Sequence, residues 1–373
     1  PAAKPGMVAA LTRGDKPVLT IYGILDGGVE HLTNIGADKK SLTRVPPITG
    51  TFASRLGFKL HKEFKPGYAV IGTLEAGFNL DDGTQGQSGS ASTPDRIFGR
   101  QLFAGLSTPF GDFTFGRQWS MLTLAMRGSD QLGPNIYAVG SLDPYLPNSR
   151  YDNSLVWQNK FGNGISAGVA YSFGRDTSGG APGSGTCGGE SASDAQACKA
   201  WSAMVRYDAK QFGVAAAVDT IKGGTGATAF FFNGAAPFAF ADSSDKDTRM
   251  TLGGYVKFGD AQFGAGWLGR KVDTATTDVE SDIYYVSASY KLTPEIKIDG
   301  GIQRAVNDDQ DRNATLTAVR GFYTLDKGLD AYAQVGHISN SSNASYQLSV
   351  GPGVAPAAGE SQTGYMVGLR YFF

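Results

Sequence analysis

The chain has 373 residues, and its 52 glycines are about twice the average share of roughly 7%. Aromatic residues make up 11% of the chain and charged residues 18%, and 33 Lys plus Arg nearly balance 34 Asp plus Glu. This near-neutral charge excludes a polybasic nucleic-acid-binding protein, and the aromatic content excludes a disordered chain. No run of 18 apolar residues occurs, so we predict no transmembrane helix and favour an all-β protein, whose surroundings could include lipid.

Segments in which apolar residues alternate with polar or small ones recur along the chain, and this period of two predicts strands with two different surroundings. Most approach the ~9–11 residues that a tilted membrane-spanning strand needs. Sixteen are predicted, in chain order: Pro17–Leu32, Phe52–Phe64, Tyr68–Asn79, Phe98–Thr108, Asp112–Trp119, Asn153–Phe161, Ile165–Gly174, Lys199–Asp208, Phe212–Lys222, Asp247–Phe258, Gln262–Lys271, Ser281–Lys291, Ile296–Val306, Ala314–Thr324, Leu329–Ile338 and Thr363–Phe373.

The last segment shows the alternation most clearly. Tyr365, Val367, Leu369 and Tyr371 share one face with the final Phe373, while mainly small or charged residues, such as Gly364, Gly368 and Arg370, occupy the other face. A soluble sandwich could contain one such strand, but sixteen of them favour a membrane barrel, because a sheet in lipid must close on itself to pair its edges.

The predicted connections alternate in length along the chain. Seven are tight, six of them with Gly, Pro or Asp as in hairpin turns, and the eight between them, Val272–Glu280 included, are mostly long and polar. Short turns at one end and long loops at the other are typical of outer-membrane barrels. We predict a 16-stranded antiparallel transmembrane β-barrel over residues 17–373, with both termini on the periplasmic side, and a non-barrel extension over residues 1–16.

Two cysteines, Cys187 and Cys198, lie in or beside a stretch rich in glycine and serine. Their separation of eleven positions fits neither a metal motif nor a redox motif. In an exported protein they could close a small surface loop as a disulfide, and two free thiols are the alternative. We expect the disulfide; no signal peptide is visible in the sequence, so this expectation assumes a mature, exported chain.

Several motifs stand out along the chain: LTIYGILDGGVE (Leu19–Glu30), GRQLFAGLS (Gly99–Ser107), FGDFTFGRQW (Phe110–Trp119), RYDNSLVW (Arg150–Trp157) and the closing GYMVGLRYFF. They resemble motifs of the general trimeric porins of Gram-negative bacteria, most closely the β-proteobacterial and neisserial type. The resemblance covers nearly the whole chain from about residue 17. The extension, the cysteine pair and the lack of a Pro-Glu-Phe-Gly-Gly element in the third long loop depart from the family pattern.

The resemblance implies a homotrimer in the outer membrane, in contact with lipid and lipopolysaccharide. Each barrel would hold a water-filled pore for small hydrophilic solutes and inorganic ions, narrowed by an inward-folded loop at about residues 120–152. The terminal Phe373 resembles the family's signal for assembly into the membrane. No cofactor, metal or nucleic-acid partner is implied.

Basic residues of the barrel wall are the first candidates for the pore constriction. In the segment Phe52–Phe64, Arg55, Lys59 and His61 alternate with apolar residues, and a cation on the lipid face costs roughly 2–4 kcal/mol at the midplane. Arg55 must therefore face the lumen. The family carries a ladder of arginines at motifs that correspond to Arg55, Arg100 and Arg150 in this chain.

Other charged residues are weaker candidates. Lys59 shares the face of Arg55, whereas Arg117 matches a family arginine near the subunit interface and fits a structural role equally well. Within the third long loop, Asp130 and Asp143 could supply an acidic side opposite the arginines, although solvated loop carboxylates are the alternative. Facing rows of opposite charge would orient dipolar solutes, and the arginine excess predicts a preference for anions.

Catalytic chemistry finds little support in the sequence. Gly164–Gly168 matches the G-x-S-x-G pattern of a nucleophile elbow, but it lies in an alternating strand with no helix predicted after it. His31, His61 and His337 are scattered over three predicted strands. We expect a passive general diffusion channel rather than an enzyme. A substrate-specific channel for an organic acid, phosphate or oligosaccharide is the alternative, and an adhesin that uses the long loops is a third.

Overall fold

The computed structural model describes most of the chain. The described ranges are 18–47, 50–86, 96–143, 150–174, 187, 189–229, 238–349 and 353–373. The predicted extension at residues 1–16 lies outside them and stays a prediction.

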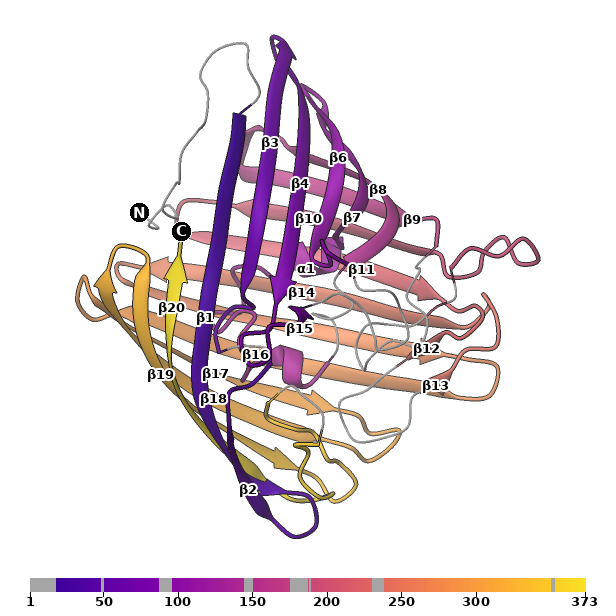
Figure 1. Cartoon of the computed structure of the whole chain (residues 1–373). Helices are drawn as coiled ribbons and strands as arrows, with labels where there is room; N and C mark the ends of the chain where they lie inside the picture. Colours follow the sequence, from indigo (N-terminus) through magenta and orange to yellow (C-terminus); the bar gives the residue numbers. More distant parts are fainter. Residues whose placement is uncertain are drawn as a thin grey trace.

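Sixteen long antiparallel strands form one closed sheet in the described residues, and they correspond one to one to the predicted segments (Figure 1). They are β1 (Val18–Ile35), β3 (Arg55–Lys65), β4 (Tyr68–Phe78), β6 (Gln101–Thr108), β7 (Gly111–Trp119), β8 (Arg150–Lys160), β9 (Ile165–Ser172), β10 (Ala200–Asp208), β11 (Phe212–Lys222), β14 (Lys246–Phe258), β15 (Ala261–Asp273), β16 (Asp278–Lys291), β17 (Ile296–Val306), β18 (Ala314–Asp326), β19 (Leu329–Asn340) and β20 (Gln362–Phe372).

Closure occurs between the first and the last strand. β1 pairs with β20 from Ile24↔Phe372 to Leu32↔Gly364, and its first half pairs with β3 from Val18↔His61 to Ile24↔Arg55. The ring therefore leaves no free edge, and the predicted 16-stranded antiparallel barrel is confirmed.

The remaining elements are short and lie in the connections. They are β2 (Lys40–Arg44), β5 (Gln85–Gly86), β12 (Thr228–Ala229), β13 (Phe238–Ala239), helix α1 (Met121–Ala125) and the 3₁₀ turns η1 (Val139–Ser141) and η2 (Gly162–Gly164). None of the helices among the described residues is long and apolar enough to cross a membrane.

The two faces of the strands differ as the alternation predicts. On β20, Tyr365, Val367 and Leu369 are between 54% and 60% exposed on the outside, whereas Met366 between them is 2% exposed and faces inward. The outside of the barrel is therefore an apolar surface that suits lipid, and polar and charged groups are left to the lumen.

Connection lengths follow the prediction with one difference. The loop expected at Val272–Glu280 is only a four-residue turn at residues 274–277, because β15 and β16 pair out to Asp273↔Asp278. An exposed ion pair, Lys271–Glu280 at 2.9 Å, lies on this extension.

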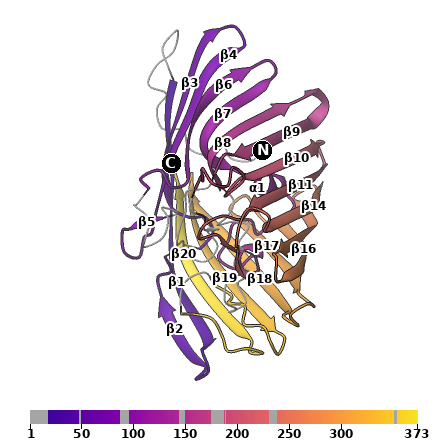
Figure 2. The ribbon, with the colours of Figure 1, turned by 90° about the vertical axis from the view of Figure 1, so that its right-hand side faces the viewer.

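The connection between β7 and β8 folds into the barrel. We call its described part, residues 120–143, the inner loop. Most of its apolar side chains form one buried cluster with inward-facing residues of the far wall, such as Leu268, Leu316 and Ile338. Figure 2 shows α1, the first element of the inner loop, inside the ring of strands. The lumen is narrowed from within, which bears out the inward fold of the third long loop.

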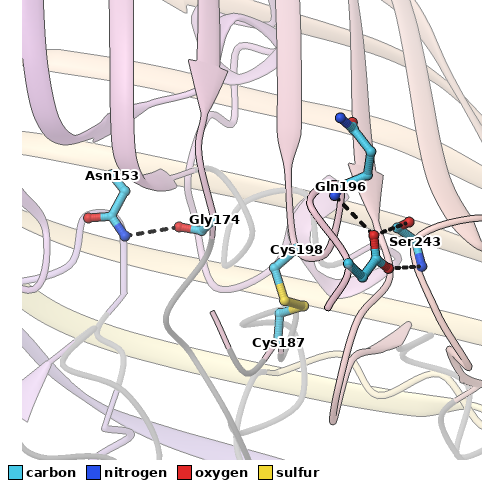
Figure 3. Close-up of a disulfide and its surroundings, with 7 residues drawn as sticks. Asn153, Gly174, Cys187, Gln196, Cys198 and Ser243 are labelled. Carbon is cyan, nitrogen blue, oxygen red and sulfur yellow. Dashed lines mark hydrogen bonds between the residues drawn. A yellow bond between two sulfur atoms is a disulfide. The ribbon is translucent and has the colours of Figure 1, made fainter. Parts of the chain in front are cut away.

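Cys187 and Cys198 form the predicted disulfide (Figure 3). Both cysteines are fully buried in a small core with Phe240, Val272 and Val279. The bridge therefore closes a loop within the connection between β9 and β10, and this loop packs against Phe240 and against the facing ends of β15 and β16.

A substitution on the outer face tests the membrane orientation. Val286 of β16 is 56% exposed on the outside. We expect Val286→Arg to lower the free energy of unfolding by about 2–4 kcal/mol in lipid vesicles, because a cation would face hydrocarbon. Val286→Leu is the matched control, and equal denaturant midpoints for the two variants would contradict the orientation.

Candidate functional site: the luminal arginine cluster

The three predicted arginines lie on neighbouring parts of the wall. Arg55 begins β3, Arg100 directly precedes β6 and Arg150 begins β8. Arg100 and Arg150 are buried, at 4% and 7% exposure, whereas Arg55 is half-buried. They are close enough for the charge of Arg100 to act on both of the others. The structure thus brings together residues that are 95 positions apart.

An indole ring lies in the middle of this group. Trp119, the last residue of β7, has the guanidinium carbon of Arg150 at 3.9 Å from its ring centroid and that of Arg100 at 5.7 Å. Both distances are within the range of a cation–π contact.

A carboxylate lies beside the arginines on the same wall. Glu75 of β4 is 3% exposed, and its Oε1 accepts a hydrogen bond from Arg100 Nε at 2.8 Å. Its Oε2 accepts one from the hydroxyl of Tyr22, also at 2.8 Å. Glu75 lies opposite Gly57 of β3 in register, and thus on the face of Arg55. These two bonds fix the carboxylate in place.

The inner loop adds a fourth guanidinium. Ser120 caps α1 by accepting a hydrogen bond from the backbone N–H of Thr123, and the helix ends just before Arg127. Arg127 is exposed, and its guanidinium lies 5.5 Å from the centroid of Trp119. Its carbonyl accepts a hydrogen bond from Arg206 of β10 at 2.6 Å. The loop therefore contributes a positive group to the cluster.

Lys59 extends the basic wall along β3. Its ammonium lies 4.9 Å from the ring centroid of Tyr22, and the side chain is exposed to the lumen. His61 is also exposed, two residues further toward the short-turn end.

Arg117 has a different environment. It pairs in register with Leu102, an outward-facing residue, and its Nε donates to the carbonyl of Gly99 at 2.7 Å. Its guanidinium forms a close ion pair with Asp152, which also binds Arg96 at 3.1 Å. These contacts fit the structural role better than a role in the pore.

The carboxylate of Asp143 is buried and paired, not exposed in the lumen. It is 3% exposed, and its two carboxylate oxygens bind Arg249 at 2.9 Å and Arg270 at 3.2 Å. Asp247 binds the same two arginines. Asp143 therefore attaches the end of the inner loop to β14 and β15, because a buried carboxylate is stable only when its charge is paired.

Asp130 is also turned toward the wall, at 8% exposure. Its Oδ1 accepts the backbone N–H of Leu132 at 3.0 Å, and Oδ2 has no hydrogen-bond partner among the described residues. Burial raises the pKa of Asp130 to about 6. Both loop carboxylates thus differ from the expectation that they would face the arginines across water.

Phe373 closes the pairing of the last strand. Its backbone exchanges two hydrogen bonds with Gly23 of β1, at 3.0 and 3.2 Å, and its ring stacks on Tyr371 at 6.0 Å. Its role as an assembly signal stays a prediction.

Sequence reasoning missed three members of the cluster. Glu75 could have been identified from the sequence, because a charged residue in the middle of an apolar strand must face the lumen. Trp119 and Arg127 could not have been identified in this way, since only the fold of the inner loop brings them to the wall arginines.

A family model and two kinds of relatives match this barrel. The model for Gram-negative porins matches residues 2–343. An outer membrane porin of Bordetella pertussis is 30% identical over 169 residues, a match that covers 42% of each chain. The aligned part therefore spans less than half of that relative. The chain belongs to the Gram-negative porin family.

Solved structures resemble the whole barrel. The anion-selective porin from Comamonas acidovorans superposes with a TM-score of 0.77 at 20% identity and covers 96% of this chain and 100% of its own. OmpT of Vibrio cholerae in its trimer form gives a TM-score of 0.66 at 18% identity, with 96% and 100% covered. These similarities concern the fold, and they agree with a barrel of the outer membrane.

The attachment of the inner loop is open to a direct test. We expect Asp143→Asn to lower the free energy of unfolding by about 3–5 kcal/mol, because the buried Arg249 and Arg270 would both lose the charge of the Asp143 carboxylate. Denaturant unfolding in detergent measures this loss. Asp81→Asn, in an exposed turn, is the control and should stay within about 0.5 kcal/mol of the parent. A similar small effect of both changes would argue against the anchoring role.

Proposed function

We propose that this chain forms a water-filled pore through which small hydrophilic solutes and ions diffuse passively, with a preference for anions. The observation that carries the proposal is the gathering of four guanidinium groups, those of Arg55, Arg100, Arg127 and Arg150, in the part of the lumen that holds Trp119 and Glu75. Selectivity in such a pore depends on its diameter and on the charges that line it.

The arrangement of charge supports anion preference in a specific way. Arg55 and Arg127 form no ion pair within the described residues, so their charge is available to a passing solute. The loop carboxylates Asp130 and Asp143, which could have offset them, are turned into the wall. Low-dielectric walls focus the resulting positive potential into the lumen. The anion selectivity of the Comamonas porin of the same fold points in the same direction.

Removal of two wall arginines tests the proposal. We expect the purified protein in planar bilayers under a KCl gradient to give a reversal potential that favours chloride, and Arg55→Ala with Arg100→Ala to reduce the chloride-to-potassium permeability ratio severalfold. The paired control is Lys39→Ala with Lys40→Ala, which removes the same charge from the exposed outer turn. Potassium preference of the parent, or an unchanged ratio in the double variant, would contradict the proposal.

We further propose that the barrel assembles as a homotrimer, with both ends of the chain on the periplasmic side. The trimer form of the structurally similar OmpT supports this assembly. The start of β1 and the end of β20 lie at the short-turn end of the ring, which supports the placement of the termini.

Electrophoresis in SDS tests the assembly at little cost. We expect an unheated sample to migrate as a trimer that collapses to a monomer on boiling, and bilayer recordings to show conductance in groups of three equal steps. A monomer band without heating, together with single independent steps, would count against the trimer.

A further inference from the structure

Trp119 contacts charged groups from three separate parts of the chain. Its ring centroid lies 3.9 Å from the guanidinium of Arg150 at the start of β8, 5.5 Å from that of Arg127 in the inner loop and 5.7 Å from that of Arg100 before β6. The side chain is half-buried at the end of β7, directly before the loop turns into the lumen.

These three guanidinium groups repel one another, because they are like charges at short range. Glu75 compensates Arg100 directly through its ion pair at 2.8 Å. The indole is the ring that attracts cations most strongly, since its π face carries partial negative charge without being a counter-ion. It can therefore hold guanidinium groups in place without adding a negative charge that would offset theirs.

We propose that Trp119 is a positioning residue for anion selectivity: its indole holds Arg100, Arg127 and Arg150 in one array and ties the inner loop to the arginine wall. The inference rests on the proposed anion-preferring pore and names the group that shapes it. A carboxylate in the same place would hold the arginines equally well but would cancel their charge. An aliphatic side chain would fill the same space without holding them.

Substitution of the ring tests this role without changing the formal charge of the pore. We expect Trp119→Leu to lower the chloride-to-potassium permeability ratio at least about twofold, because the guanidinium groups would separate and find other partners. Trp119→Phe, which keeps an aromatic face, should restore most of the ratio. Trp201→Leu on the outer face of β10, where the side chain is 42% exposed, should leave it unchanged.

The outcomes separate this inference from the function on which it rests. If the parent protein prefers anions and Trp119→Leu, folded and conducting, keeps the same ratio, only the role of Trp119 fails. The role also fails if Trp119→Phe is as impaired as Trp119→Leu. If the parent itself shows no preference for anions, the proposed function and the inference fail together.

A spectroscopic measurement covers the case in which Trp119→Leu does not fold. In a variant with Trp157, Trp201 and Trp267 changed to Phe, Trp119 is the single source of indole fluorescence. We expect the ratio of iodide to caesium quenching to exceed that of free N-acetyltryptophanamide, and Arg127→Ala to lower this ratio, because the surrounding cations concentrate anions at the ring. A ratio no higher than that of the free compound, or no effect of Arg127→Ala, would overturn the inference.

Discussion

Hydrogen bonding of the backbone in lipid is the constraint on which the rest of this structure depends. Each unpaired N–H or carbonyl in hydrocarbon costs several kcal/mol, so the sheet must close, and it does so through the pairing of β1 with β20. Closure creates two surfaces of opposite character on the same strands. Charged side chains are driven to the inner surface because the outer one cannot solvate them.

The many charged side chains of the inner surface need counter-charges within the protein, and the inner loop supplies one of them. Its apolar residues pack against the far wall, and Asp143 reaches Arg249 and Arg270, which are themselves buried. The carboxylate of Asp143 thus stabilises the position of the loop. The basic groups at its start and on the nearby wall remain in the lumen, and this division of roles gives the pore its positive side.

The arginine cluster combines two kinds of partner with different effects on its field. Glu75 neutralises part of the charge where it binds Arg100, whereas Trp119 contacts three guanidinium groups without removing any charge. A narrow passage lined in this way can be rigid and still strongly positive. Rigidity favours selectivity, because a charged side chain that moves freely pairs with counter-ions. Its charge then acts less on a passing solute.

The sequence by itself determined the strand order, the strand number and the inward direction of Arg55, and it favoured the disulfide of Cys187 with Cys198. Each of these depends on a local pattern, either the period of two along a strand or the chemistry of a short segment. Only the tertiary structure decided that Asp130 and Asp143 turn into the wall and that Arg127 joins the arginines. Those positions depend on the path of the inner loop across the lumen, and that path is set by packing against β14 to β19, between residues far apart in the chain.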